Sequence, residues 1–201
     1  MNPPISTSKL LQYRVELIFI ITYIELDSID NHSMISKINT AISENRIELL
    51  RQMEKEFDDK NERYFKDLLA HDDIVIRTRC VCILADLGGK TAIEHISQVL
   101  ANDKDALVRH EAAFSLGQLG FTNAIDALSK AVESDPSFFV RHEAAVALGV
   151  IGSEKARTCL NKALKDESEE VRESAIIALA NLDYISTTMK RNNRFTRMTG
   201  G

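Results

Sequence analysis

An aliphatic residue followed directly by an arginine recurs along the chain at a nearly constant interval. The spacings between successive pairs are 32, 32 and 31 residues, for Ile76-Arg77, Val108-Arg109, Val140-Arg141 and Val171-Arg172. Repeats of this length are typical of helix pairs that stack side by side. No strand-like alternation of polar and apolar positions competes with this pattern between Glu44 and Leu182. The sequence therefore predicts an all-α solenoid of stacked antiparallel helix pairs.

Glycines follow the same register. The first helix of each pair should end at a glycine twelve residues after the aliphatic position, at Gly88, Gly120 and Gly152. Gly117 and Gly149 also align, and we expect them to let neighbouring helices approach closely. We expect the second helices at residues 91–101, 123–132 and 154–164, and an additional N-terminal helix at 44–57. The acidic stretch from Asn102 to Asp105 is expected to cap the helix that follows it.

The repeat does not extend to either end of the chain. We expect residues 1–43 to form an N-terminal extension or capping helix, residues 44–184 the repeat domain, and residues 185–201 a basic flexible tail. The apolar run from Leu17 to Ile24 is far too short to span a membrane, and no signal-peptide pattern surrounds it. The tail is basic through Lys190, Arg191, Arg194 and Arg197.

Composition narrows the possible partners and the compartment. The net charge of -5 argues against nucleic acid binding on the main surface and suits a basic protein partner. The three cysteines, Cys80, Cys82 and Cys159, follow no disulfide or metal-site spacing and are expected to be small buried hydrophobic residues. Such a set predicts a reducing compartment, and we expect the cytoplasm.

A tetrapeptide within the repeat carries candidate chemistry. Arg-His-Glu-Ala occurs at Arg109–Ala112 and again at Arg141–Ala144, 32 residues later. The two copies supply two imidazoles, His110 and His142, and two carboxylates, Glu111 and Glu143. This is the ligand set that non-haem iron and related divalent metals prefer. The sequence thus predicts a metal site.

Recent duplication is the simpler explanation for the doubled motif, and the pattern of identities argues against it. Residues 108–120 and 140–152 are identical at nine of thirteen positions, whereas the following eighteen positions share four identities. The outer repeats carry Thr78-Arg79 and Glu173-Ser174 at the same two places, so the solenoid itself does not require His-Glu. The motif is therefore interpreted as functional.

Helix geometry predicts how the motif residues are shared. Successive residues on a helix point about 100° apart, so His110 and Glu111 cannot face the same point. Equivalent residues on packed neighbouring helices, whose axes lie about 8 to 10 Å apart, can converge. We expect His110 and His142 to converge on one metal and their neighbouring glutamates to face a second metal, a substrate amine or a partner chain.

The segments around the motifs resemble deoxyhypusine hydroxylase, a HEAT-like repeat protein. The resemblance covers roughly Ile76 to Leu182, and its most specific parts are LVRHEAAFSLGQLG and FVRHEAAVALGVIG, preceded by ADLGGKTAIEHISQVL. It implies a HEAT-like repeat α-solenoid and a di-iron monooxygenase that uses dioxygen to hydroxylate deoxyhypusine, a lysine extended with an aminobutyl group, on a translation factor. The phycobilisome-lyase type of HEAT-like repeat is similar in VR..AA.ALG..G but typically lacks the paired His-Glu.

The resemblance also implies residue roles. His110 and His142 become iron ligands, Glu111 becomes the carboxylate ligand to the iron of the other half, and Glu143 becomes the catalytic residue that binds the cationic substrate side chain. Chains of the family contain two such halves, whereas this chain contains one. We therefore expect a homodimer with two irons. We expect this dimer to bind neither membranes nor nucleic acid directly.

Two alternatives remain open at the level of the sequence. The first is a non-enzymatic HEAT-repeat adaptor that binds a protein partner on its concave face. The second is a bilin-related lyase or chaperone built on the same scaffold.

Overall fold

The computed structural model describes residues 44–189. The chain divides into two compact units, residues 1–48 and 49–201, and the account below concerns the second. The extension or capping helix predicted for residues 1–43, and the part of the predicted tail from residue 190 onward, lie outside the described residues.

The described residues form helices and connecting turns, without strands, which confirms the predicted all-α solenoid. The helices are α3 (Glu44–Asp58), α4 (Glu62–Leu68), α5 (Ile74–Leu87), α6 (Lys90–Asn102), α7 (Ala106–Leu119), α8 (Ile125–Ser134), α9 (Phe138–Ile151), α10 (Arg157–Ala163) and α11 (Glu169–Met189). Short 3-10 turns, Thr122–Ala124 and Glu154–Ala156, lead into α8 and α10.

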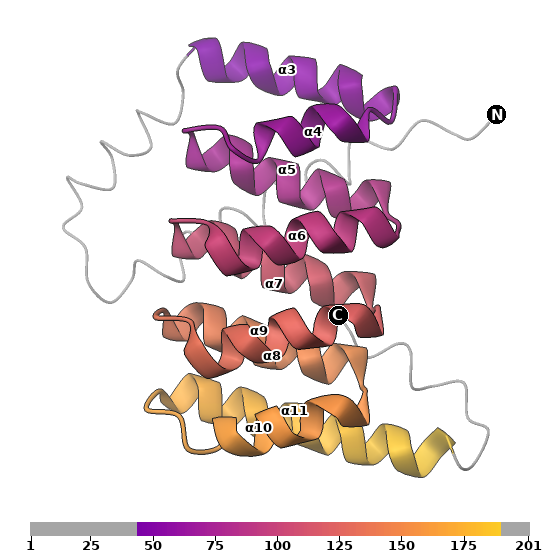
Figure 1. Cartoon of the computed structure of the whole chain (residues 1–201), viewed down its shortest axis with the longest axis vertical. Coiled ribbons are helices and arrows are strands. Elements are labelled where there is room, and N and C mark those ends of the chain that lie inside the picture. Colours follow the sequence, from indigo (N-terminus) through magenta and orange to yellow (C-terminus); the bar gives the residue numbers. More distant parts are fainter. Residues whose placement is uncertain (1–43, 190–201) are drawn as a thin grey trace. The chain divides into compact units, whose positions relative to one another are not determined.

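The helices of the second unit stack in two rows (Figure 1). Helices α5, α7, α9 and α11 pack side by side in that order, and α6, α8 and α10 form the second row. Each helix of the second row also packs against the first-row helix that follows it. Large aliphatic side chains fill the space between the rows, including Leu84, Ile96, Leu116, Leu128, Leu148, Leu160 and Leu182, all fully or almost fully buried.

The glycines have the two predicted roles. Gly120 and Gly152 end α7 and α9 in the left-handed conformation, with φ of 68° and 67°, where a residue with a Cβ is strained. A Cβ added to Gly117 would lie 2.9 Å from the Cβ of Ala147, and one added to Gly149 would lie 2.8 Å from the Cβ of Ala178. The first-row helices therefore cross at backbone-to-methyl contact, as predicted.

The recurring arginines form a buried ladder of ion pairs. Arg109 donates from Nε and Nη2 to the two carboxylate oxygens of Asp135 at 2.7 and 2.9 Å, and from Nη1 to the Asp103 carbonyl at 2.9 Å. Arg77 pairs in the same way with Asp103, and Arg141 with Asp166. Each arginine thus ties the start of a first-row helix to the end of its second-row partner. These bidentate bonds raise the pKa of all three guanidinium groups.

The ladder corrects the predicted role of the acidic stretch from Asn102 to Asp105. Asp105 occupies the N-cap position of α7, but its side chain makes no capping hydrogen bond. The carboxylate of Asp103 instead accepts from the Asp105 backbone N–H at 2.8 Å and from Arg77. The capping prediction was wrong because a buried guanidinium competes for the same carboxylates.

The C-terminal limit of the repeat domain also differs from the prediction. Helix α11 continues through Ile185 to Met189, so the expected tail begins inside a helix. A Cβ on Gly152 would collide with Cδ1 of Ile185, which shows that Ile185 packs over the end of α9.

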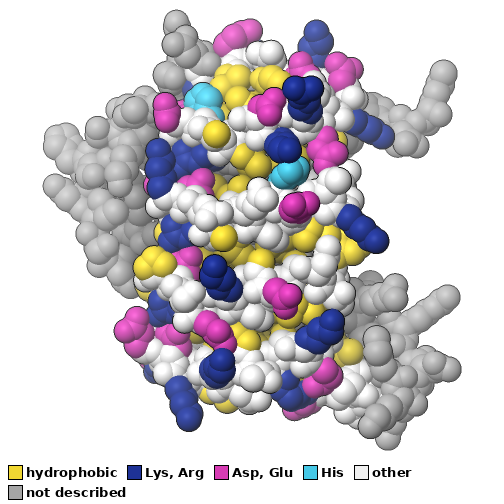
Figure 2. All heavy atoms as spheres, viewed as in Figure 1, with side chains coloured by type: hydrophobic (Ala, Val, Ile, Leu, Met, Phe, Trp, Pro, Cys, Tyr) yellow, Lys and Arg dark blue, Asp and Glu magenta, His cyan; other side chains and the backbone are white. Residues whose placement is uncertain are grey.

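Basic and acidic side chains alternate over the face seen in Figure 2, and neither sign forms a continuous region there. None of the helices within residues 44–189 is long and apolar enough to cross a membrane.

Candidate functional site

The two Arg-His-Glu-Ala copies lie in the first half of α7 and of α9, which are neighbours in the first row. Val108 and Val140, one turn into their helices, are fully buried and fix which way each helix faces. His110, Glu111 and His142 contact side chains of neighbouring first-row helices.

His110 is almost completely buried and contacts the second motif. Its Nε2 lies 3.3 Å from Oε2 of Glu143 on α9. Its ring stacks on Phe139, with centroids 3.8 Å apart and planes inclined by 7°. The other ring nitrogen, Nδ1, is buried and has no hydrogen-bond partner in the described part of the chain. Such an orphaned polar atom is uncommon in a protein interior and is often associated with a ligand or a functional role.

Glu111 faces a different set of neighbours. It is 7% exposed, and its Oε1 accepts hydrogen bonds from the Cys82 thiol at 3.1 Å and from the Ser115 hydroxyl at 3.5 Å. Burial raises the pKa of the Glu111 carboxyl above its ordinary value, His110 opposes that rise, and the charge of Glu143 adds to it. Glu111, His110 and Glu143 therefore lie within electrostatic range of one another.

His142 is held by α11. Its Nδ1 lies 2.6 Å from Oγ of Ser174, and that hydroxyl lies 2.7 Å from the Glu170 carbonyl. Because the carbonyl can only accept, the single hydroxyl hydrogen of Ser174 is directed to Glu170. Nδ1 of His142 is then the donor to Ser174, and in a neutral imidazole the lone pair would lie on Nε2. A histidine fixed in this way presents Nε2 as a ligand atom.

A common rule relates these contacts: the histidine of one repeat meets the residue at the glutamate position of the next. His110 meets Glu143, and His142 meets Ser174, which stands in register with Glu143. The neighbouring His110 and Glu111 diverge, in the way that helix geometry requires. The sequence did not predict the roles of Phe139, Cys82, Ser115 and Ser174. Cys80 and Cys159 are buried as expected, whereas Cys82 is half-buried and donates a hydrogen bond to the Glu111 side chain.

The donor types suit iron, but one chain does not bring enough of them together. Neutral imidazoles and carboxylates are the usual ligands of non-haem iron, and His110 has a buried nitrogen without a partner. Within residues 44–189, however, no three His, Cys, Asp or Glu side chains are grouped so that they could hold a metal ion. Of the four motif side chains, His110 and Glu143 contact each other.

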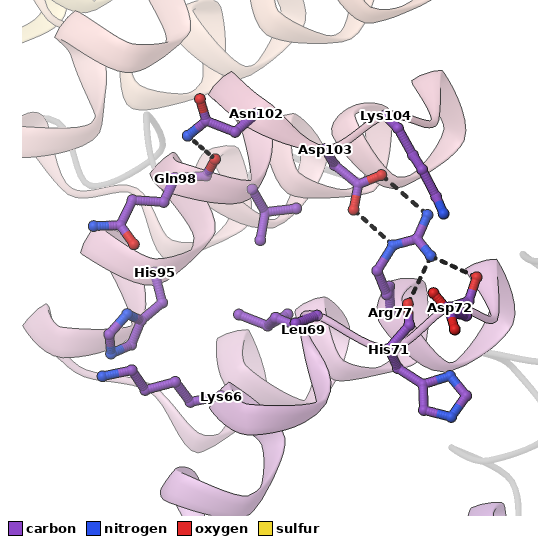
Figure 3. Close-up of a pocket in the computed structure, with 12 residues that line it drawn as sticks. Lys66, Leu69, His71, Asp72, Arg77, His95, Gln98, Asn102, Asp103 and Lys104 are labelled. Atoms are coloured by element: carbon purple, nitrogen blue, oxygen red, sulfur yellow. Dashed lines mark hydrogen bonds and ion pairs between the residues drawn. The ribbon is translucent and has the colours of Figure 1, made fainter.

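A pocket of about 480 Å³ lies elsewhere, between the end of α4 and the face of α6 (Figure 3). Lys66 and His95 point toward one another at one end, and Arg77 with Asp103 closes the other. Its lining contains none of His110, Glu111, His142 or Glu143, so it is not part of the predicted site.

Comparison with known proteins identifies the repeat type. A family model described as HEAT repeats matches residues 93–180. The solved structure of human deoxyhypusine hydroxylase in complex with glycerol is similar, with 31% sequence identity and a TM-score of 0.60 over 64% of this chain. The match covers 46% of the human chain, so this chain spans less than half of that protein.

A second similar structure is the complex of CpcE and CpcF of phycocyanin lyase from Nostoc, at 18% identity, a TM-score of 0.43, and coverage of 68% of this chain and 73% of that one. A likeness at that level carries no information about function. No curated protein sequence matches the chain.

Proposed function

We propose that this protein is an iron-dependent monooxygenase of the deoxyhypusine hydroxylase type, with a site completed by a second copy of the chain. Its substrate would be a deoxyhypusine side chain on a translation factor, and dioxygen the co-substrate. One observation carries the proposal: the doubled motif, found in a chain 31% identical to human deoxyhypusine hydroxylase, places a buried histidine against the glutamate of the neighbouring copy.

The residues would divide the work in the following way. His110 and His142 would bind iron through ring nitrogens; Nδ1 of His142 contacts Ser174, whereas its Nε2 has no hydrogen-bond partner within residues 44–189. Glu111 would supply the carboxylate ligand. Bound iron would activate dioxygen. Glu143, half-buried beside His110, would hold the cationic end of the substrate side chain, because a carboxylate in a partly desolvated site attracts an amine strongly.

The second copy follows from the number of donors. Two imidazoles and two carboxylates are too few to complete two iron sites, and the described residues of one chain form no three-ligand group. A twofold dimer doubles the set and makes its two sites equivalent.

Iron content of the purified chain tests the metal assignment. His110→Ala and His142→Ala should each lose most of the bound iron, because each removes a ligand. His95→Ala, a matched control outside both motifs, should retain it. Elemental analysis and the optical spectrum of aerobically purified protein give the result, and unchanged iron in both motif variants would refute the assignment.

A non-enzymatic adaptor is the second candidate. It is favoured by aliphatic side chains that remain exposed on α9 and α11, namely Val146, Val150, Ile176 and Ile177, since clustered exposed apolar residues often mark a protein-binding surface. An adaptor would contain no iron as purified, so the same measurement separates the two functions.

A further inference from the structure

Glu111 and Glu143 occupy the same place in neighbouring repeats, but their carboxylates have different partners. Glu111 accepts hydrogen bonds from a thiol and a hydroxyl, whereas Glu143 has His110 as its neighbour. The two copies of the motif are therefore not equivalent within one chain, although their sequences are nearly identical.

Both donors to Glu111 interrupt positions that are otherwise apolar in the repeat. The residues in register with Cys82 are Phe114, Val146 and Ile177. Those in register with Ser115 are Ile83, Ala147 and Ala178. Ala147 and Ala178 fill the close helix crossings at Gly117 and Gly149, so packing at this position does not call for a hydroxyl. Two polar exceptions that meet at one carboxylate suggest a role directed at that carboxylate.

The two donors also bind the same oxygen. Both contacts are made to Oε1 of Glu111, and Oε2 accepts no hydrogen bond among the described residues. We infer that Cys82 and Ser115 are positioning residues, which hold Oε1 of Glu111 so that Oε2 is presented as a metal ligand. This inference rests on the proposed function, because it takes Glu111 to be a ligand.

Hydrogen-bond donors that orient a metal-binding carboxylate usually affect metal affinity nearly as strongly as the ligand itself. Removal of such an outer contact typically weakens metal affinity by about 10- to 100-fold. Cys82 supplies the shorter contact, so we expect it to have the larger effect. A serine at position 82 retains a donor and should restore most of the affinity.

The test compares Fe(II) affinity in variants of the full chain under anaerobic conditions. Cys82→Ala should weaken binding by about 10- to 100-fold, and Cys82→Ser should bind within a few-fold of wild type. Cys80→Ala is the matched control: Cys80 is fully buried in the same helix and donates no hydrogen bond within residues 44–189. Its loss should lower the melting temperature and leave Fe(II) affinity unchanged, which separates positioning from a purely structural role.

Melting temperatures of the metal-free protein distinguish failure of this inference from failure of the proposed function. The melting-temperature shifts of Cys82→Ala and Glu111→Ala should be non-additive in the double variant, because each change removes the same hydrogen bond. Additive shifts overturn the inference. Loss of iron in Glu111→Ala but not in Cys82→Ala also overturns it and leaves the proposed function standing. Non-additive shifts with unchanged iron in Glu111→Ala overturn the ligand role of Glu111 and, with it, the positioning role toward iron.

Discussion

The buried ion pair between Arg141 and Asp166 shows how one carboxylate of the repeat stabilises the fold. Both side chains are largely buried, and the guanidinium donates to both oxygens of Asp166 at 2.9 Å. Burial alone would raise the pKa of Asp166, but the bonds from Arg141 and from the Ser168 N–H bring it below its ordinary value. The ionised form is therefore the one that the fold stabilises.

We predict that Asp166→Asn lowers the free energy of unfolding at pH 7 by about 2 kcal/mol, because Arg141 loses both charge-assisted hydrogen bonds to Asp166 and keeps only the exposed carboxylate of Glu167 as a counter-ion. Since the folded-state pKa of Asp166 is depressed, its stabilisation is complete above the unfolded-state pKa of about 3.9 and is lost as pH falls below it. Urea unfolding at pH 7 and pH 3 should show the difference between wild type and variant shrinking. Glu154→Gln, which affects an exposed ion pair, should change little, and a pH-independent difference would contradict the argument.

At the residue scale, the sequence singled out candidate side chains for the proposed chemistry and could not predict their partners. His110, Glu111, His142 and Glu143 were chosen because their identity is concentrated in one part of the repeat. Their contacts depend on a shift of one residue between neighbouring helices, which brings His110 to Glu143. That shift depends on how α7 and α9 pack against each other, and it cannot be derived from the residue types.

At the scale of the element, glycine register predicted both the helix ends and the close crossings. The aspartates at the turns were misread because capping by a carboxylate and pairing with a buried arginine have the same local sequence signature. The predicted end of the repeat domain, at residue 184, lies inside α11. The residues after Tyr184 are mostly polar, but Ile185, which directly follows it, packs over Gly152, and α11 continues past Ile185.

We predict that Gly149→Ala destabilises the fold by about 1 to 2 kcal/mol. The new Cβ would lie 2.8 Å from the Cβ of Ala178, and overpacking of this kind typically costs about 1–3 kcal/mol. The higher helix propensity of alanine offsets at most about 1 kcal/mol of that cost. Thermal unfolding measures the change.

Val146→Ala, at a partly exposed site on the same helix, serves as the control and should have a smaller effect. If Gly149→Ala were stabilising, α9 and α11 would have room to separate without penalty, and the close crossing would not constrain the fold.

At the scale of the whole molecule, the proposed iron site would require two copies of the chain. The HEAT-type stack supplies His110, His142 and both glutamates from adjacent helices, and the described residues of one chain do not complete a metal site. The two motif copies contain four ligand-type residues, which can be counted from the sequence without a structure. Which surfaces meet in a dimer depends on two copies and cannot be derived from one chain's pattern.

A mixed dimer tests the shared site. If each iron is held by His110 and His142 of one subunit and by Glu111 of the other, a chain with both histidines replaced by alanine can still lend its Glu111. Paired with a Glu111→Ala chain, it should restore one complete site and bind about one iron per dimer, whereas homodimers of either variant should bind almost none. Differently tagged chains, co-purified and analysed for iron and by light scattering, give the stoichiometry. A monomer that holds two irons tightly would contradict the shared site, and a monomer without iron would favour the adaptor.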